Sequence, residues 1–216
     1  MRIWVFMRKI VVVFVLTVVF KNATAQVQWG IDANLNYSFI KAKDQIMPPS
    51  IIPGVTLQNI YAPASTGIMG FSAGVWMNTG DVFYIQPELS IATKGSSFVF
   101  DVNGQGRQVS VVFTNLQLPL LLGVKIGGLI VDLDVVAGPV FEINLAKKNS
   151  FTSEIEGAYP TFGAYKNKFL GLQYGVSVGL DNFKLNCRYE NSLHDLDDNF
   201  EQRAYVFYTG LSFRFW

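Results

Sequence analysis

One stretch near the C-terminus holds the residue types of a hydrolase. Ser192-Leu193-His194-Asp195 contains a nucleophile, a base and an acid, and His194 is the only histidine of the chain. Such a set supports acyl transfer when the three side chains meet in space. Residues this close in sequence rarely reach that geometry. We therefore expect no catalytic residue, and an enzyme acting on lipid or peptide is kept only as a third hypothesis.

The sequence offers little for a metal or a cofactor. Asp195, Asp197 and Asp198 follow one another closely, without the twelve-residue ligand spacing of an EF-hand. Cys187 is the only cysteine, so an intramolecular disulfide is excluded. We expect Cys187 to be a small apolar filler, and we predict no metal site and no cofactor.

Charged residues recur at alternate positions, which is the spacing of one face of a β-strand. If the strands close into a barrel, one wall would bring together a lumen charge network of Asp32, Glu88, Lys94, Lys125, Asp132, Asp134, Asp181, Lys184, Arg188, Glu190 and Arg214. Because both signs are present, we predict that these charges neutralise one another and close the lumen. An ion-selective channel would show one dominant sign.

Eight stretches with a period of two must position these charges. From Val27 to Phe39 the odd positions are mostly apolar and the even positions mostly polar or glycine. The same two faces recur in residues 69–77, 83–94, 115–125, 129–137, 170–181, 183–190 and 205–215. Alternation of this kind indicates strands rather than helices. The sequence predicts an all-β fold, an eight-stranded antiparallel up-and-down transmembrane β-barrel.

The connections alternate between short and long. Tight turns are predicted at residues 78–81, 127–128 and 181–182, and long loops at residues 41–67, 95–108, 142–168 and 192–202. Short turns at one end and long loops at the other are typical of bacterial transmembrane barrels, in which the short turns are periplasmic.

The apolar face decides between a membrane barrel and a soluble one. It carries no charged residue in these strands, and a lipid-facing Lys or Arg at the bilayer midplane costs roughly 2–4 kcal/mol. We therefore favour a lipid-facing apolar surface, and keep a soluble exported lipocalin-like carrier as an alternative. Aromatic residues at the strand ends predict two interfacial girdles: Trp29, Phe83, Phe183, Phe213 and Phe215 at the short-turn end, and Tyr37, Phe39, Phe71, Tyr189 and Tyr205 at the long-loop end.

The first residues are typical of a secretory signal peptide. Arg2, Arg8 and Lys9 precede a predominantly apolar run over residues 10–20, and residues 23–25 supply small side chains for cleavage. We predict a signal peptide over residues 1–25 and an outer-membrane β-barrel domain over residues 26–216. Without the signal peptide the chain has a small acidic excess, so no basic surface for nucleic acid is expected.

Three stretches in order resemble the PorT-like outer-membrane β-barrel family. They are Gln86-Pro87-Glu88-Leu89 continuing to Lys94-Gly95-Ser96, then Leu116-Gln117-Leu118-Pro119-Leu120-Leu121-Leu122, and then Ala137-Gly138-Pro139. The resemblance implies a location in the cell outer membrane and a role in protein secretion. The last residues, Phe213-Arg214-Phe215-Trp216, are similar to the signal by which barrel assembly machinery recognises its clients, although the parity of the strand leaves Trp216 as an extra residue.

The functional hypothesis is a non-enzymatic outer-membrane barrel with a charge-plugged lumen. It would act as a structural or interaction protein through its long outer loops, with outer-membrane lipid around it and a secretion-system or surface protein as partner. The second hypothesis is a narrow porin-like channel for small solutes or ions.

Overall fold

A computed structural model describes residues 27–42, 55–57, 67–103, 105–127, 131–150, 152–158, 165–196 and 202–215. The predicted signal peptide and most of the predicted loop over residues 41–67 lie outside these ranges. The elements are β1 (Val27–Ala42), β2 (Val55–Leu57), β3 (Ile68–Gly80), β4 (Phe83–Val102), β5 (Gln105–Gly127), β6 (Asp132–Asn149), α3 (Ser153–Ala158), β7 (Lys168–Leu180), β8 (Phe183–Ser192) and β9 (Gln202–Arg214). No helix in these ranges is long and apolar enough to cross a membrane.

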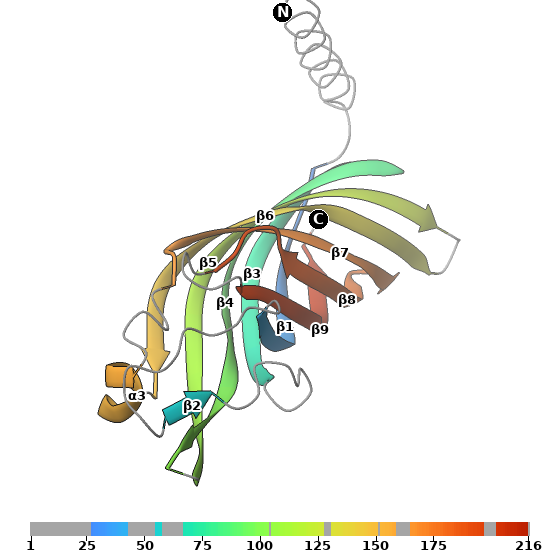
Figure 1. Cartoon of the computed structure of the whole chain (residues 1–216). Helices are drawn as coiled ribbons and strands as arrows, with labels where there is room; N and C mark the ends of the chain where they lie inside the picture. The colour runs from blue at the N-terminus through green and yellow to red at the C-terminus, as the bar shows by residue number, and fades with distance from the viewer. Residues whose placement is uncertain are drawn as a thin grey trace, which may run out of the picture.

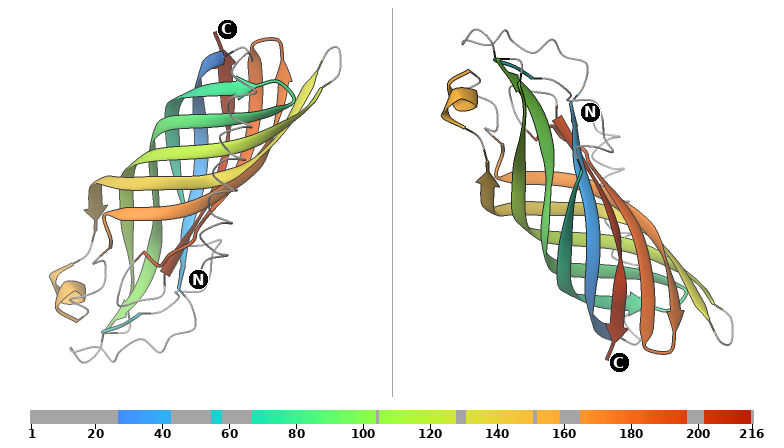
Figure 2. Two further views of the ribbon diagram at one scale, coloured as in Figure 1. Left: turned by 90° about the horizontal axis from the view of Figure 1, so that it is seen from above. Right: turned by 90° about the horizontal axis from the view of Figure 1, so that it is seen from below.

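Eight of the strands form a closed antiparallel ring (Figures 1 and 2). Each strand pairs with its neighbour in sequence, apart from the short β2; β1 also pairs with β9, and this pairing closes the ring. β2 lies outside the ring and pairs with the far end of β4. The prediction of an eight-stranded antiparallel up-and-down barrel is therefore confirmed.

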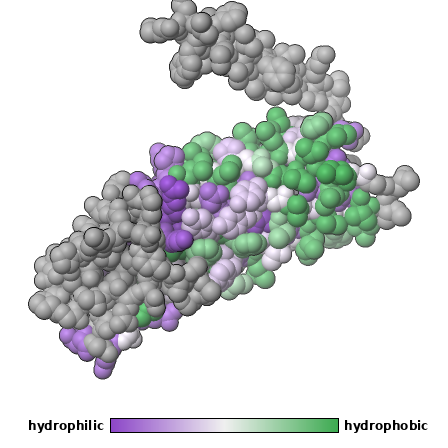
Figure 3. All heavy atoms as spheres, turned by 45° about the vertical axis from the view of Figure 1, so that its right-hand side comes forward, coloured by the Kyte–Doolittle hydropathy of each residue, from purple (hydrophilic) through white to green (hydrophobic). Residues whose placement is uncertain are grey.

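The direction of the two faces follows the alternation of the sequence. Leu35 is 59% exposed on the outer wall, whereas its neighbour Asn36 is 1% exposed inside. The same contrast repeats around the ring, and hydrophobic side chains cover much of the described wall in Figure 3. An apolar exterior around a polar interior is the arrangement of a membrane barrel, and it is the reverse of the soluble carrier kept as an alternative.

The two ends of the barrel differ as the predicted connections do, with two corrections. Tight turns join β3 to β4 and β7 to β8 at one end, where Gly80 (φ 134°) and Asp181 (φ 52°) adopt a positive φ. Residue 128 of the turn predicted at residues 127–128 lies outside the described ranges. At the other end the loop predicted over residues 95–108 is wrong. β4 and β5 continue through it as a paired hairpin that turns at Asn103, with φ 55°. The loop predicted from residue 142 is wrong at its start too, because β6 runs on to Asn149.

Candidate functional site

Two strands that face each other across the barrel carry the central charges. In ring order, β4 and β8 lie four strands apart in either direction, so they are diametrically opposed. The Arg188 guanidinium of β8 donates from Nη1 to both carboxylate oxygens of Glu88 on β4, at 2.9 and 2.8 Å. Gln86 donates a further hydrogen bond of 2.6 Å to Glu88. The pair therefore spans the whole lumen.

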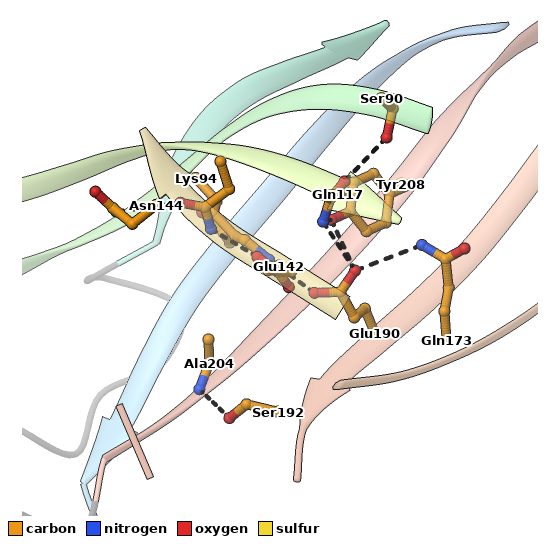
Figure 4. Close-up of polar contacts among 12 residues, drawn as sticks. Ser90, Lys94, Gln117, Glu142, Asn144, Gln173, Glu190, Ser192, Ala204 and Tyr208 are labelled. Carbon is orange, nitrogen blue, oxygen red and sulfur yellow. Dashed lines mark hydrogen bonds and ion pairs between the residues drawn. The ribbon is translucent and has the colours of Figure 1, made fainter. Parts of the chain in front are cut away.

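A second pair joins the same two strands nearer the long-loop end. Lys94 Nζ of β4 lies 2.7 Å from Glu190 Oε1 of β8 and 2.6 Å from Glu142 Oε1 of β6 (Figure 4). All three side chains are buried, each with a relative exposure of at most 6%. We name Glu88–Arg188 and Lys94–Glu190 the cross-lumen pairs.

Neutral side chains complete the hydrogen bonding of the two glutamates. Glu190 Oε2 accepts from the Tyr208 hydroxyl at 3.0 Å and from Gln117 Nε2 at 3.2 Å. Glu142 Oε2 accepts from Asn115 Nδ2 at 2.6 Å. Buried carboxylates are stable only when their oxygens are paired in this way, so these amides and the phenol are structural parts of the site.

A third ion pair lies nearer the short-turn end. Lys184, the first inward residue of β8, lies 2.5 Å from Asp134 Oδ2 of β6. Beside this level, Tyr84, Leu121 and Val136 form a small buried apolar cluster. The lumen is thus filled at successive heights along β8, by Lys184, then Arg188, then Glu190.

Four residues of the predicted network lie outside these contacts, which corrects the prediction. Lys125, Asp132 and Arg214 are partly exposed and Asp181 is exposed, because each lies at or next to a short turn rather than within the lumen. Arg214 donates to the backbone carbonyl of Asp181 at 2.7 Å. Asp32 is buried and accepts from Asn34 Nδ2 at 2.5 Å, and it forms no ion pair with another described residue.

Glu142 is the charged member that the sequence prediction missed. It lies at the start of the loop predicted over residues 142–168, but alternation continues through it, with Val140 and Glu142 inside and Phe141 and Ile143 outside. This continued period of two is the signal in the sequence that predicts a longer strand with Glu142 on its inner face. With Glu142 included, the buried charges of the described lumen are five carboxylates (Asp32, Glu88, Asp134, Glu142 and Glu190) and three cations (Lys94, Lys184 and Arg188).

Two small cavities border these charges. A cavity of about 20 Å³ lies at the long-loop side of Lys94, lined also by Ser38, Asn115 and Phe169. Another, of about 10 Å³, borders Asp32, Glu88 and Arg188. Spaces of this size hold about one water molecule, so neither admits a solute.

Apolar side chains cover the network at its outer end. The rings of Phe113 and Tyr165 meet edge to face at 4.9 Å, and Phe113 also contacts Phe169 with ring centres 6.3 Å apart. Leu196 is buried, and its carbonyl accepts from the Lys166 amide at 2.9 Å. The segments before β7 and after β8 therefore meet above the cross-lumen pairs.

The comparisons with known proteins agree with this architecture. Residues 21–198 match the family described as outer membrane protein beta-barrel domain. The chain belongs to this family. Its location is the outer membrane, as predicted, whereas the narrower PorT-like assignment stays a prediction.

Two solved structures are similar to this chain at low sequence identity. Ail, the attachment invasion locus protein of Yersinia pestis, in complex with the heparin analogue sucrose octasulfate, is 12% identical with a TM-score of 0.44, over 88% of this chain and 99% of Ail. Outer membrane protein AlkL in DMPC lipid bilayers is 13% identical with a TM-score of 0.38, over 88% and 91%. No curated protein matches the chain.

The predicted aromatic girdles of this outer-membrane barrel occupy both ends of its outer wall. At the short-turn end Trp29, Phe83 and Phe183 are exposed, Phe183 contacts Phe213 at 5.0 Å between ring centres, and Phe213 contacts Phe215 at 5.4 Å. At the other end the structure brings together, in successive ring contacts, Tyr37, Phe39, Tyr205 and Tyr189. Phe71 is exposed on β3, and Tyr174 and Phe207, which the prediction left out, both contact Tyr189.

The hydrolase-like residues do not assemble into a triad. The Ser192 hydroxyl accepts from the Ala204 amide at 2.9 Å, His194 is exposed, and Asp195 lies 3.5 Å from Arg203 Nε. Cys187 is exposed on the outer wall.

The sequence also holds two G-x-S-x-G stretches, at residues 70–74 and 175–179. Their serines, Ser72 and Ser177, lie buried in the middle of β3 and β7. A hydrolase nucleophile instead needs a sharp turn between a strand and a helix.

Proposed function

We propose that this protein is a closed, non-enzymatic outer-membrane barrel that anchors and displays its outer segments. The observation that carries the proposal is that both cross-lumen pairs join β4 to β8, the two strands farthest apart in the ring. An eight-stranded barrel has an interior that side chains can fill. In this proposal, the charges paired across the diameter block the passage of a solute through the lumen.

The proposal places function at the long-loop end. β5 has 23 residues and β8 has 10, so the β4–β5 hairpin extends well beyond the strands on the opposite side. β2 and α3 lie at the same end, beside this extension (Figure 2). A projecting hairpin with exposed polar residues such as Gln105, Arg107 and Gln108 suits contact with a protein partner or the cell exterior.

Assistance to protein secretion is one form of this proposal. It rests on the three PorT-like sequence stretches, and it would use the same outer end. Shortening the hairpin by residues 98–108 should then reduce secretion while the barrel remains folded, as judged by its heat-modifiable electrophoretic mobility. Unchanged secretion in a folded, shortened barrel would argue against this form.

A narrow cation channel is the competing function, and one observation favours it: five buried carboxylates face three buried cations. An excess of one sign is what a selective pore would show. Ion flux from liposomes that contain the full mature protein separates the two functions. The closed barrel predicts a leak equal to that of empty liposomes, and a potassium leak that rises with the protein content would establish the channel.

A further inference from the structure

The outward-facing charges of the barrel wall have a single sign. Within the described side chains of the eight ring strands, the charged ones that point outward are Lys41, Lys148, Lys168 and Arg203. All four lie at the long-loop end of their strands, which faces the outer leaflet. The charges of the lumen, by contrast, are mixed in sign. The outer rim of the wall is therefore basic.

Lys41 and Arg203 form the most concentrated part of this rim. They are directly opposite each other in the β1–β9 register, and both are exposed. Like charges at directly opposite positions destabilise a strand pair unless an anion lies between them. Among the described residues, the Asp195 carboxylate, 3.5 Å from Arg203 Nε, supplies one negative charge for the two cations, and it is itself partly exposed.

An aromatic stack lies immediately below the two cations. Phe39 and Tyr205 are the next outward pair on β1 and β9, with ring centres 5.3 Å apart and planes inclined by 22°. Aromatic residues of this kind sit at the headgroup level of a bilayer. The position of the stack therefore places Lys41 and Arg203 where the polar part of a lipid begins.

We infer that Lys41 and Arg203 bind a phosphate group of a phosphorylated glycolipid in the outer leaflet. The arginine fork matches two oxygens of a phosphate, and the lysine adds a compact charge beside it. The site opens sideways to the bilayer above a lipid-facing stack, so its chemistry favours an amphiphile over a soluble anion. The inference is independent of whether the lumen is closed.

The test uses the mature full-length protein in nanodiscs of zwitterionic phosphatidylcholine, with diphosphorylated lipid A titrated in. Retained lipid A is counted by native mass spectrometry. The double variant Lys41→Gln/Arg203→Gln should bind lipid A about 30-fold more weakly. Each basic residue near a membrane surface adds a similar free energy to the binding of anionic lipid, so the effects of losing the two multiply in the dissociation constant. Asp195→Asn, which removes the competing carboxylate, should bind a few-fold more tightly.

A matched control removes two positive charges from the opposite end of the barrel. Lys125→Gln/Arg214→Gln changes two partly exposed cations beside the short turns and should leave lipid A affinity unchanged. Heat-modifiable mobility verifies that each variant is folded. Equal affinity of both double variants would overturn the inference. So would equal retention of phosphatidylglycerol or of dephosphorylated lipid A, or displacement of lipid A by a soluble sulfated oligosaccharide at equal concentration.

Discussion

Arg188 and Glu88 lie on opposite walls of the barrel, and their side chains meet in its centre at 2.8 Å. Each comes from a strand four positions away in the ring, so the contact fixes the diameter of the lumen. Lys94 and Glu190 repeat the contact between the same two strands. Two pairs of long charged side chains therefore cross the described part of the lumen.

Removal of Arg188 should destabilise the barrel strongly. Arg188→Ala leaves the Glu88 carboxylate buried without its cation, and breaking a buried pair in this way costs about 3–5 kcal/mol. Urea titration of the protein in lipid vesicles, followed by electrophoretic mobility, measures the loss. The double variant Arg188→Met/Glu88→Gln, which removes both charges, should lose much less. Equal losses would contradict a direct pair.

Replacing Lys94 should reduce the stability of the barrel more than the loss of one charge suggests, because Lys94 forms ion pairs with two carboxylates. Lys94→Met leaves both Glu142 and Glu190 without a cation. We expect a loss of stability at least as large as that of Arg188→Ala, about 3–5 kcal/mol, in the same titration. Adding Glu142→Gln to Lys94→Met should recover part of it. No recovery would show that Glu142 is not coupled to Lys94.

Gly123 should not tolerate a side chain, because Tyr84 fills the space above it. A Cβ at Gly123 would overlap the Tyr84 ring, whereas one at Gly106 would meet its nearest neighbour, Val99, at 3.7 Å. Gly123→Ala should therefore cost about 1–3 kcal/mol of unfolding free energy, as other overpacked cores do. Gly106→Ala is the control and should be near neutral. Similar costs for both would contradict the close packing of Tyr84.

Ser38 should protect the outer part of β4 from hydrogen exchange. Its hydroxyl accepts from the Gly95 amide at 2.7 Å and donates to the Gly95 carbonyl at 2.9 Å, where regular β3–β4 pairing is interrupted. Ser38→Ala should speed amide exchange at Gly95. Thr93→Val is the matched variant, since Thr93 Oγ1 accepts from the Phe71 amide at 3.0 Å, and it should speed exchange at Phe71 instead. An unchanged Gly95 rate in Ser38→Ala would count against the contact.

The strands could be predicted from the sequence because the two faces of a membrane barrel differ so sharply in polarity. Leu35 and Asn36 illustrate it, since lipid on one side and a polar lumen on the other force strict alternation. The extension of β4 and β5 was not predictable in the same way. Gly and Ser from Gly95 to Ser97 resemble a loop, yet these residues are buried and pair with β5.

The partners within the lumen could not be predicted from sequence. Alternation places Lys94, Glu142 and Glu190 on the inner wall, but which of them meet depends on strand tilt and on the stagger of the whole ring. The bulge between Thr114 and Asn115 shifts the β5–β6 register by one residue just beside Glu142. Sequence gives no direct sign of the tilt, of the stagger or of that shift, so the contact between Glu142 and Lys94 is known from the structure alone.

Single-channel recording in a planar bilayer tests the closed lumen most directly. The wild-type protein, inserted in the folded state, should give no discrete conductance steps in potassium chloride. Arg188→Ala/Glu88→Ala, which shortens both side chains of one cross-lumen pair, should give small steps if it remains folded by the mobility assay. Discrete, reproducible steps in the wild-type protein would contradict the account.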